Sequence, residues 1–224
     1  MAIDARGHTI PEGFGHPARS DLLGLSLSIR DVIPAANPTD RDVIYAALVA
    51  AGLSPAATPV LIDRLDTGNL ERNDGGGWRV IASRAVYGKV TFTTAQAGAA
   101  TGVEGHPAWA GLDANSTDTS MWSAGAPTRL VIPFSGWYTM RAQCGFATNS
   151  AGWRVLTIRV NAASYLGECM SNPISGGPSI CQVHGEGYLS AGDYLELGAW
   201  QNSGSTLNYV TDSSIPAYLS VSKS

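Results

Sequence analysis

The chain has few charged residues, few cysteines and no long apolar run. Asp, Glu, Lys and Arg make up 14% of its 224 residues, against about 25% in a typical soluble domain. So low a share of charge indicates that part of the surface is covered by other subunits. The net charge of −4 also lacks the basic excess of a nucleic-acid-binding protein, so no nucleic-acid partner is expected.

No segment has the sequence of a membrane span or an export signal. The longest apolar stretch, residues 43–53, is too short to cross a bilayer, which takes about 20 residues, so no membrane partner is expected. The first residues have no apolar region of the kind that a secretory leader carries. We therefore expect synthesis in a reducing compartment.

The cysteines are too few and too scattered for a metal site. Cys144, Cys169 and Cys181 show neither a C-x-x-C pair nor the spacing of zinc ligands, so no metal is predicted. Cys144 fits a small core residue. Cys169 and Cys181 lie in segments that read as loops, and they could form a bridge if oxidised. A reducing compartment disfavours that bridge, but the sequence leaves it open.

Catalytic motifs are missing as well. The chain contains no nucleophile elbow, P-loop or zinc-protease motif, and its 4 histidines are isolated from one another. A glycosidase would need two carboxylates across a groove, and Glu168 with Glu186, or Asp193 with Glu196, could be considered. Asp193 follows Gly192 in a predicted turn, where such a side chain usually bonds nearby backbone. We expect no enzyme activity, no catalytic residue and no cofactor.

What the sequence does contain is period-two alternation of apolar and polar residues. The alternating segments are 137–144, 154–160, 194–200 and 217–221. Gly, Asn, Ser and Pro turns separate them, which is typical of antiparallel strands in a sandwich. The chain is therefore predicted to be mainly β, with a C-terminal antiparallel jelly-roll sandwich. The positions expected to face its core are Tyr138, Met140, Ala142, Cys144, Leu156, Ile158, Val160, Leu195, Leu197, Ala199, Ala217, Leu219 and Val221.

Three regions are predicted along the chain. Residues 1–35 have closely spaced turn formers and no sustained period, which predicts an extended attachment arm that orders by docking. Residues 36–94 form a mounting region of a short helix and a β-meander. Residues 95–224 form the jelly-roll head, and its first part, 95–111, is rich in Ala and Gly and reads as a linker or a loosely paired leading strand.

Within the mounting region, one helix and one meander are expected. Thr39 is the predicted helix N-cap and Gly52 the residue just past its end. The meander has strands at 60–65, 70–72 and 78–81, and residues 87–93 could add another strand. The apolar stripe of the helix is predicted to consist of Val43, Ala46, Ala47, Val49 and Ala50.

The head resembles the tumour-necrosis-factor-like jelly rolls, a superfamily that includes the complement globular heads. The likeness begins with His-Pro-Ala-Trp-Ala-Gly-Leu at 106–112 and continues through 118–122, 127–133 and 136–138. Segments 189–197 and 217–221 follow in the order that the superfamily shows. The resemblance implies a homotrimer packed around a threefold axis. No acidic cluster matches the calcium site of the complement heads, so no metal ligand is inferred.

The N-terminal half resembles a second group. Residues 63–78, which include Asn-Asp-Gly-Gly-Gly-Trp, are similar to the Asp-Gly-x-x-Trp hairpins of tailed-bacteriophage virion proteins, especially minor tail proteins of actinobacterial phages. The resemblance implies a virion appendage with the arm bound to other virion proteins and the head outward. The chain has no collagen-like repeat, coiled coil or β-helix, which favours a short knob, spike or capsid decoration over a long fibre.

One group of residues fits a sugar-binding surface. Trp153 is predicted at the tip of a turn that includes Asn149, and Asn202 follows Trp200 in a second polar loop. Sugars stack on aromatic rings and bond to amides at the rim of a site. Asn149, Trp153, Trp200 and Asn202 are therefore the candidate ligand-binding residues, with a host cell-surface glycan as the ligand.

These observations favour a structural virion protein of a bacteriophage, a homotrimeric appendage that displays its head for host-surface adhesion. Minor tail protein, fibre knob and capsid decoration stay open as locations in the virion. A polysaccharide-degrading tail spike enzyme (glycosidase) and a sugar-binding lectin are the alternatives.

Overall fold

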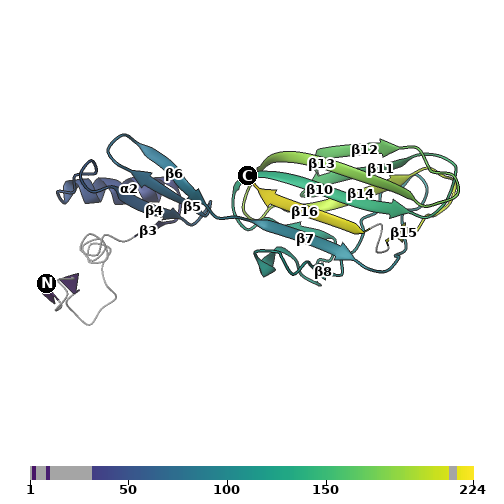
Figure 1. Ribbon diagram of the computed structural model, residues 1–224, viewed down its shortest axis with the longest axis horizontal. Helices are drawn as coiled ribbons and strands as arrows, with labels where there is room; N and C mark the ends of the chain where they lie inside the picture. Colours follow the sequence, from purple (N-terminus) through teal and green to yellow (C-terminus); the bar gives the residue numbers. More distant parts are fainter. Residues whose placement is uncertain (1, 4–8, 11–31, 212–215) are drawn as a thin grey trace. The chain divides into compact units, whose positions relative to one another are not determined.

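The protein, seen in a computed structural model that describes residues 2–3, 9–10, 32–211 and 216–224, divides into two units (Figure 1). The first unit is Met1–Arg84, and the second, Ala85–Ser224, is called the head. In the predicted arm, β1 (Ala2–Ile3) pairs antiparallel with β2 (Thr9–Ile10). Most of residues 1–35 lies outside the described residues, so the extended arm stays a prediction.

The first unit is a small sheet covered by one helix. Strands β3 (Ile33–Ala35), β4 (Val60–Arg64), β5 (Asn69–Asn73) and β6 (Trp78–Ser83) lie in that order, with β3 parallel to β4 and the others antiparallel. Helix α2 (Pro38–Ala50) packs on β3 and β4. The predicted helix and β-meander are therefore confirmed.

Details of helix α2 differ from the prediction. The N-cap is Asn37 and not Thr39, because Asn37 Oδ1 accepts the Asp40 N–H at 3.0 Å and Pro38 fits the first turn. Gly52, with φ of 94°, follows the helix end as predicted. The buried residues are Ile44 and Leu48, one turn apart on the face toward the sheet. The predicted stripe is wrong in that Val43 and Val49 are exposed. The apolar alanines of the helix made more than one face of it look apolar in the sequence.

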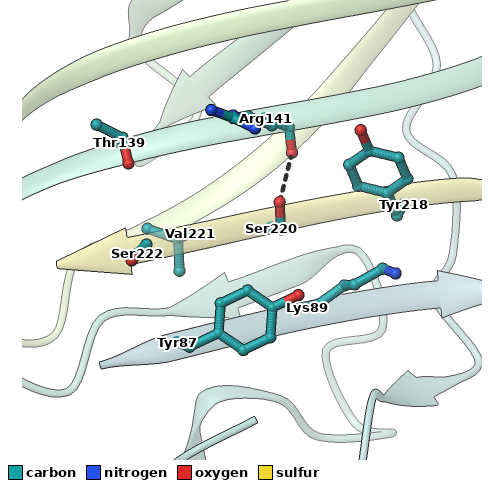
Figure 2. Close-up of a pocket in the computed structure, with 8 residues that line it drawn as sticks. All are labelled: Tyr87, Lys89, Thr139, Arg141, Tyr218, Ser220, Val221 and Ser222. Atoms are coloured by element: carbon teal, nitrogen blue, oxygen red, sulfur yellow. Dashed lines mark hydrogen bonds between the residues drawn. The ribbon is translucent and has the colours of Figure 1, made fainter. Parts of the chain in front are cut away.

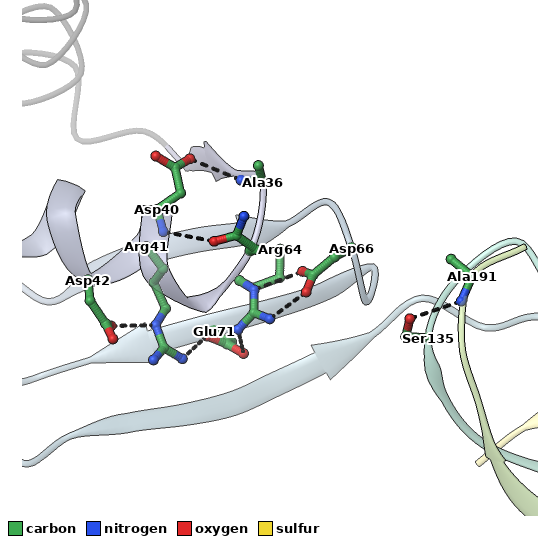
Figure 3. Close-up of polar contacts among 10 residues, drawn as sticks. Ala36, Asp40, Arg41, Asp42, Arg64, Asp66, Glu71, Ser135 and Ala191 are labelled. Atoms are coloured by element: carbon green, nitrogen blue, oxygen red, sulfur yellow. Dashed lines mark hydrogen bonds and ion pairs between the residues drawn. The ribbon is translucent and has the colours of Figure 1, made fainter.

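A chain of ion pairs joins helix and sheet in the first unit (Figure 3). Glu71 accepts from Arg41 Nη1 at 2.8 Å and from Arg64 Nη1 at 3.0 Å. Arg64 also makes two bonds to Asp66, at 2.8 and 2.9 Å. The Arg41 guanidinium lies 4.9 Å from the centre of the Trp78 ring. The core formed by the described residues of this unit is small, so this network is expected to contribute much of the stability of the described part.

The head is a sandwich of two antiparallel sheets (Figure 1). One has the order β13 (Ser179–Leu189), β10 (Gly136–Phe146), β16 (Ala217–Lys223), β7 (Tyr87–Phe92) and β8 (Gly111–Leu112), with β15 (Tyr209–Val210) paired to β10. The other has the order β12 (Ser164–Ser171), β11 (Arg154–Val160), β14 (Tyr194–Gln201) and β9 (Arg129–Val131). A short 3-10 helix spans Thr119–Met121.

The strand pairs of the head are nested. The first long strand pairs with the last (β7 with β16), β9 with β14, β10 with β13, and β11 with β12. A chain folded back on itself and then rolled up gives this order, which is that of a jelly roll. The predicted mainly β fold with a C-terminal jelly-roll sandwich is confirmed.

The predicted core positions of the head face inward as expected. Every one of them is buried except Val160, which is partly buried at the end of β11 and packs against the core. On β10 the alternate residues Trp137, Thr139 and Arg141 are exposed, whereas Gln143 is buried. Period-two alternation therefore identified the two faces of these strands correctly.

The head also contains segments that the sequence assigned elsewhere. Strand β7, placed by prediction in the mounting region 36–94, pairs with β16, so the head begins at Ala85. Residues 95–111 are not a linker, because Gln96 and Gly105 form bridges to Tyr209 and Ala199. Buried Ala99 adds to the head core.

Strands β12 and β13 were not predicted, and Cys169 and Cys181 lie in them and not in loops. Here glycines replace the expected apolar residues. A Cβ on Gly185 would meet Leu166 O at 2.5 Å, and one on Gly167 would collide with His184 O. At one side of the sandwich the backbones of β12 and β13 therefore lie in direct contact, which only glycine allows. All three cysteines are free, so the bridge left open between Cys169 and Cys181 is not formed.

Burial predicts a graded thiol reactivity in the native protein. Cys144 and Cys181 are buried and Cys169 is partly exposed. Desolvation raises the pKa of the Cys144 thiol and raises that of Cys181 to about 11. Since the thiolate is the reactive form, we expect iodoacetamide at pH 8 to alkylate Cys169 first, as peptide mapping would show. Reaction at Cys181 should increase as the pH rises toward 11, and equal labelling of all three thiols at pH 8 would contradict this packing.

Candidate functional site

The head has two structurally distinct ends. At one end β7 begins beside the end of β16, since Tyr87 pairs with Ser222, and the last residue, Ser224, bonds to Trp137 O at 2.9 Å. At the other end lie two polar loops, residues 147–153 and 202–208, here called the loop pair. The chain therefore enters and leaves the head at the end opposite the loop pair.

The loop pair contains three of the four predicted ligand-binding residues. Asn149 Nδ2 donates to Ser205 Oγ at 3.2 Å, and the Trp153 N–H donates to Asn202 Oδ1 at 2.5 Å. The Asn202 N–H donates back to Trp153 O at 3.4 Å. Asn149, Trp153 and Asn202 are thus brought together as the sequence indicated, with the Trp153 side chain 48% exposed.

The fourth predicted residue, Trp200, points elsewhere. It lies in β14 beside Gln201, whose side chain is completely buried. Because neighbouring residues of a strand face opposite sides, Trp200 lies on the outer face of its sheet, where it is partly buried. The amide oxygens of Asn149 and Asn202 both accept bonds from loop N–H groups. The amides that were expected to bind sugar therefore hold the loop pair together. The Trp153 ring remains exposed to solvent.

Arg154 anchors the loop 147–153 from below. Its guanidinium donates to the carbonyls of Asn149, Ala151 and Trp153 at 2.8 to 3.1 Å and lies 6.0 Å from the Phe146 ring centre. The residue is completely buried and no carboxylate pairs with it within the described residues. Burial lowers the pKa of this guanidinium. The carbonyl cradle therefore takes the place of a counterion.

The carboxylates considered for glycosidase chemistry serve other roles where their contacts are seen. Asp193 accepts from Asn161 Nδ2 and the Ser190 N–H, both at 2.8 Å. Glu196 is buried and accepts from Thr128 Oγ1 at 2.8 Å. Glu168 and Glu186 are exposed on β12 and β13. No group of three metal-ligating side chains occurs in the part of the chain that the structure describes, and none of its helices there is long and apolar enough to span a membrane.

A groove lies on the open face of the sheet that contains β10, β16 and β7, and is here called the sheet groove (Figure 2). It has a volume of about 530 Å³, in the range of small-ligand sites. The floor is β16, with Lys89 on β7 at one side and Arg141 on β10 at the other (Figure 2). The lining residues are Tyr87, Lys89, Thr139, Arg141, Tyr218, Ser220, Val221 and Ser222.

The strand register places basic residues side by side across the groove. Ser220 pairs with Arg141 on one side and Lys89 on the other, and Arg141 pairs with His184 of β13. Adjacent strands lie about 4.8 Å apart, so His184, Arg141, Ser220 and Lys89 form one row, here called the basic row. Tyr218 lies in the neighbouring row on one side, with Lys89 Nζ 5.3 Å from its ring centre.

Tyr87 lies at the end of the groove opposite Tyr218, in the row of Ser222. Desolvation, reinforced by the charge of Asp113, raises the pKa of its hydroxyl, which therefore keeps its proton and can donate at neutral pH. Sequence reasoning missed the sheet groove. The alternation marks these residues as outward-facing, but which strands lie next to one another is set by the long-range pairing of the roll.

Comparisons with known proteins find similarity among solved structures alone. No known protein family and no curated protein matches the sequence. Among solved structures, the crystal structure of murine APRIL at pH 5.0 matches with 13% identity and a TM-score of 0.44, and that at pH 8.0 with 12% identity and a TM-score of 0.47. Each match covers 63% of this chain and 100% of the other. Both are likenesses of fold.

Proposed function

We propose that this protein is a bacteriophage virion component, a homotrimeric appendage whose head is displayed for adhesion to the host surface. The observation that carries the proposal is the polarity of the head. The chain joins it at one end, where Tyr87 pairs with Ser222, and the loop pair with exposed Trp153 lies at the other. A module attached through its N-terminal side presents such loops outward.

The virion origin is supported by the hairpin resemblance of residues 63–78 and by the small first unit that precedes the head. It does not rest on the matched structures. The arrangement fits a tail tip and a capsid surface equally well. In either place the predicted arm would bind other virion proteins. Immunogold labelling of intact particles decides between the two locations, and particles without label would contradict a virion component.

The homotrimer is supported by apolar side chains exposed where β12 and β13 meet. Met170 is 54% exposed and Ile174 53% exposed, and Ile180, near the start of β13, is 37% exposed. Strand β12 is the edge of its sheet. An apolar patch at one side of a subunit can pack against a different surface of the next copy, and such head-to-tail contacts close into a ring. This edge patch is the proposed contact between copies.

A mass measurement tests the assembly. Light scattering during size-exclusion chromatography is expected to give three times the 23.3 kDa of one chain. Replacing Ile174 with Glu puts a charge into the contact, and we expect it to shift the particle to the mass of one chain. Val103→Glu serves as the matched control, because Val103 is equally exposed in the head but lies outside the edge patch. A wild-type mass of one chain would contradict the homotrimer.

A further inference from the structure

We propose that the sheet groove binds an anionic saccharide, with Arg141 and Lys89 of the basic row holding its acidic groups. The inference rests on the proposed adhesion role and names the class of receptor for it. It places that receptor on the sheet face, away from the loop pair where the sequence predicted it.

The two cations of the groove are without a carboxylate partner. No ion pair involves Arg141 or Lys89 among the residues that the structure describes, although Arg129 and Arg159 of the head are both paired. The Asp113 N–H donates to Lys89 O, and its carboxylate accepts two bonds from Asn115 at 2.9 Å. Those bonds, and to a lesser extent the charge of Lys89, lower the pKa of Asp113. Asp113 does not line the groove, where the charged side chains are Lys89 and Arg141.

Glu186 is the other acidic group near the row. It lies on β13 opposite Thr139, one row away from Arg141, and is exposed to water. It forms no ion pair with Arg141 within the described residues, although both side chains line a second hollow of the sheet face together with His184. A bound acidic group between Arg141 and Lys89 would lie on the side of Arg141 away from β13, with Ser220 beneath it (Figure 2).

The remaining lining fits a sugar better than a bare ion. Tyr87 and Tyr218 offer ring surface at the two ends of the groove, and Thr139 and Ser222 offer hydroxyl groups. The Ser220 hydroxyl donates to Arg141 O at 3.3 Å and can still accept a bond. Sugar rings pack on aromatic side chains, while their hydroxyls exchange hydrogen bonds with neighbouring polar groups. Cations, hydroxyls and aromatic rings together favour an acidic saccharide over phosphate or a neutral glycan.

A second copy of this chain is the competing occupant. A twofold contact of groove on groove would bring the cations of two copies together, which is unfavourable. The proposed contact between copies includes the edge patch near β12 and β13, which contains neither Lys89 nor Tyr218. The two occupants are separated by measuring binding and mass on the same variants.

The experiment is calorimetric titration of the full chain with oligogalacturonate, with dextran sulfate and with neutral dextran. We expect the two anionic polymers to bind and dextran not to bind, and the difference between the first two identifies carboxylate or sulfate as the preferred group. Arg141→Gln and Lys89→Gln should each weaken binding about tenfold or more, since bonds to charged groups are worth this much. Arg79→Gln, an exposed arginine of the first unit, is the charge-matched control and should bind as wild type does.

Several outcomes would overturn the inference. Absence of binding by the wild type, or equal losses in all three variants, would show that no specific anionic site exists on the sheet face. A change of mass in Arg141→Gln without a change in binding would assign the groove to contact between copies. A wild type that keeps the trimer mass but binds no polymer would leave the proposed assembly intact while contradicting the site. Circular dichroism of each variant shows that lost binding is not lost folding.

Discussion

Replacement of Glu71 by Gln is expected to unfold the first unit in a large fraction of molecules. The Glu71 side chain is 8% exposed and holds two arginines, Arg41 and Arg64, at 2.8 and 3.0 Å. Gln keeps the shape of the side chain but leaves both guanidinium groups without their shared charge. Removing one partner of a buried ion pair typically costs about 3–5 kcal/mol.

That cost is large beside the stability available to this unit. Among its described residues the core consists of five buried apolar side chains and a few partly buried neighbours, and small domains with small cores are only marginally stable. Asp66 still pairs with Arg64 and raises the pKa of that guanidinium, but it lies at the exposed end of the network. It therefore cannot replace Glu71 between the helix and the sheet.

Hydrogen exchange followed by mass spectrometry resolves the first unit from the head in the full chain. In Glu71→Gln we expect amides of β4 and β5 to lose protection by two or more orders of magnitude, while peptides of the head remain unchanged. Asp42→Asn is the control, because Asp42 binds Arg41 from an exposed position and such pairs contribute about 1 kcal/mol or less. Unchanged protection of β4 and β5 in Glu71→Gln would show that the network adds no stability.

The sequence predicted what depends on local periodicity and missed what depends on pairing. Leu195, Leu197 and Ala199 were assigned to the core because a strand alternates strictly, and they are buried. Strand β13 was not predicted because Gly185 and Gly187 lie where a strand pattern requires apolar residues. Glycine is needed at these positions because β12 and β13 approach closely. No local pattern shows that requirement.

The same limit applies to the candidate sites. Asn149, Trp153 and Asn202 were recognised because loop residues are marked by turn-forming neighbours, and the structure does bring them together. That their amides would hold the loops could not be foreseen, since the partners are about 50 residues away along the chain. The sheet groove is assembled from three strands, and Lys89 and Arg141 become neighbours only through β16.

Replacement of Arg154 by Met is expected to loosen the loop 147–153 and destabilise the head. The carbonyl oxygens of Asn149 and Ala151 lose this donor, and Trp153 O keeps the Asn202 N–H at 3.4 Å. An acceptor left unpaired away from water costs about 1–3 kcal/mol, and these partly buried oxygens are expected to cost toward the lower end of that range each. Part of this is offset, because Met removes a cation that burial already disfavours, as its lowered pKa indicates.

The free energy of unfolding of the head is expected to fall by about 2–3 kcal/mol, which for a chain of this size lowers the melting temperature by roughly 5–10 °C. Because Trp153 N–H is held by Asn202 only while the loop keeps its shape, exchange at residues 149–153 should accelerate below that temperature. Arg141→Met is the control for stability, since Arg141 is exposed on β10 and forms no ion pair within the described residues. A variant at Arg154 that melts as the wild type does and keeps slow exchange in the loop would show that the carbonyl cradle is not what orders the surface carrying Trp153.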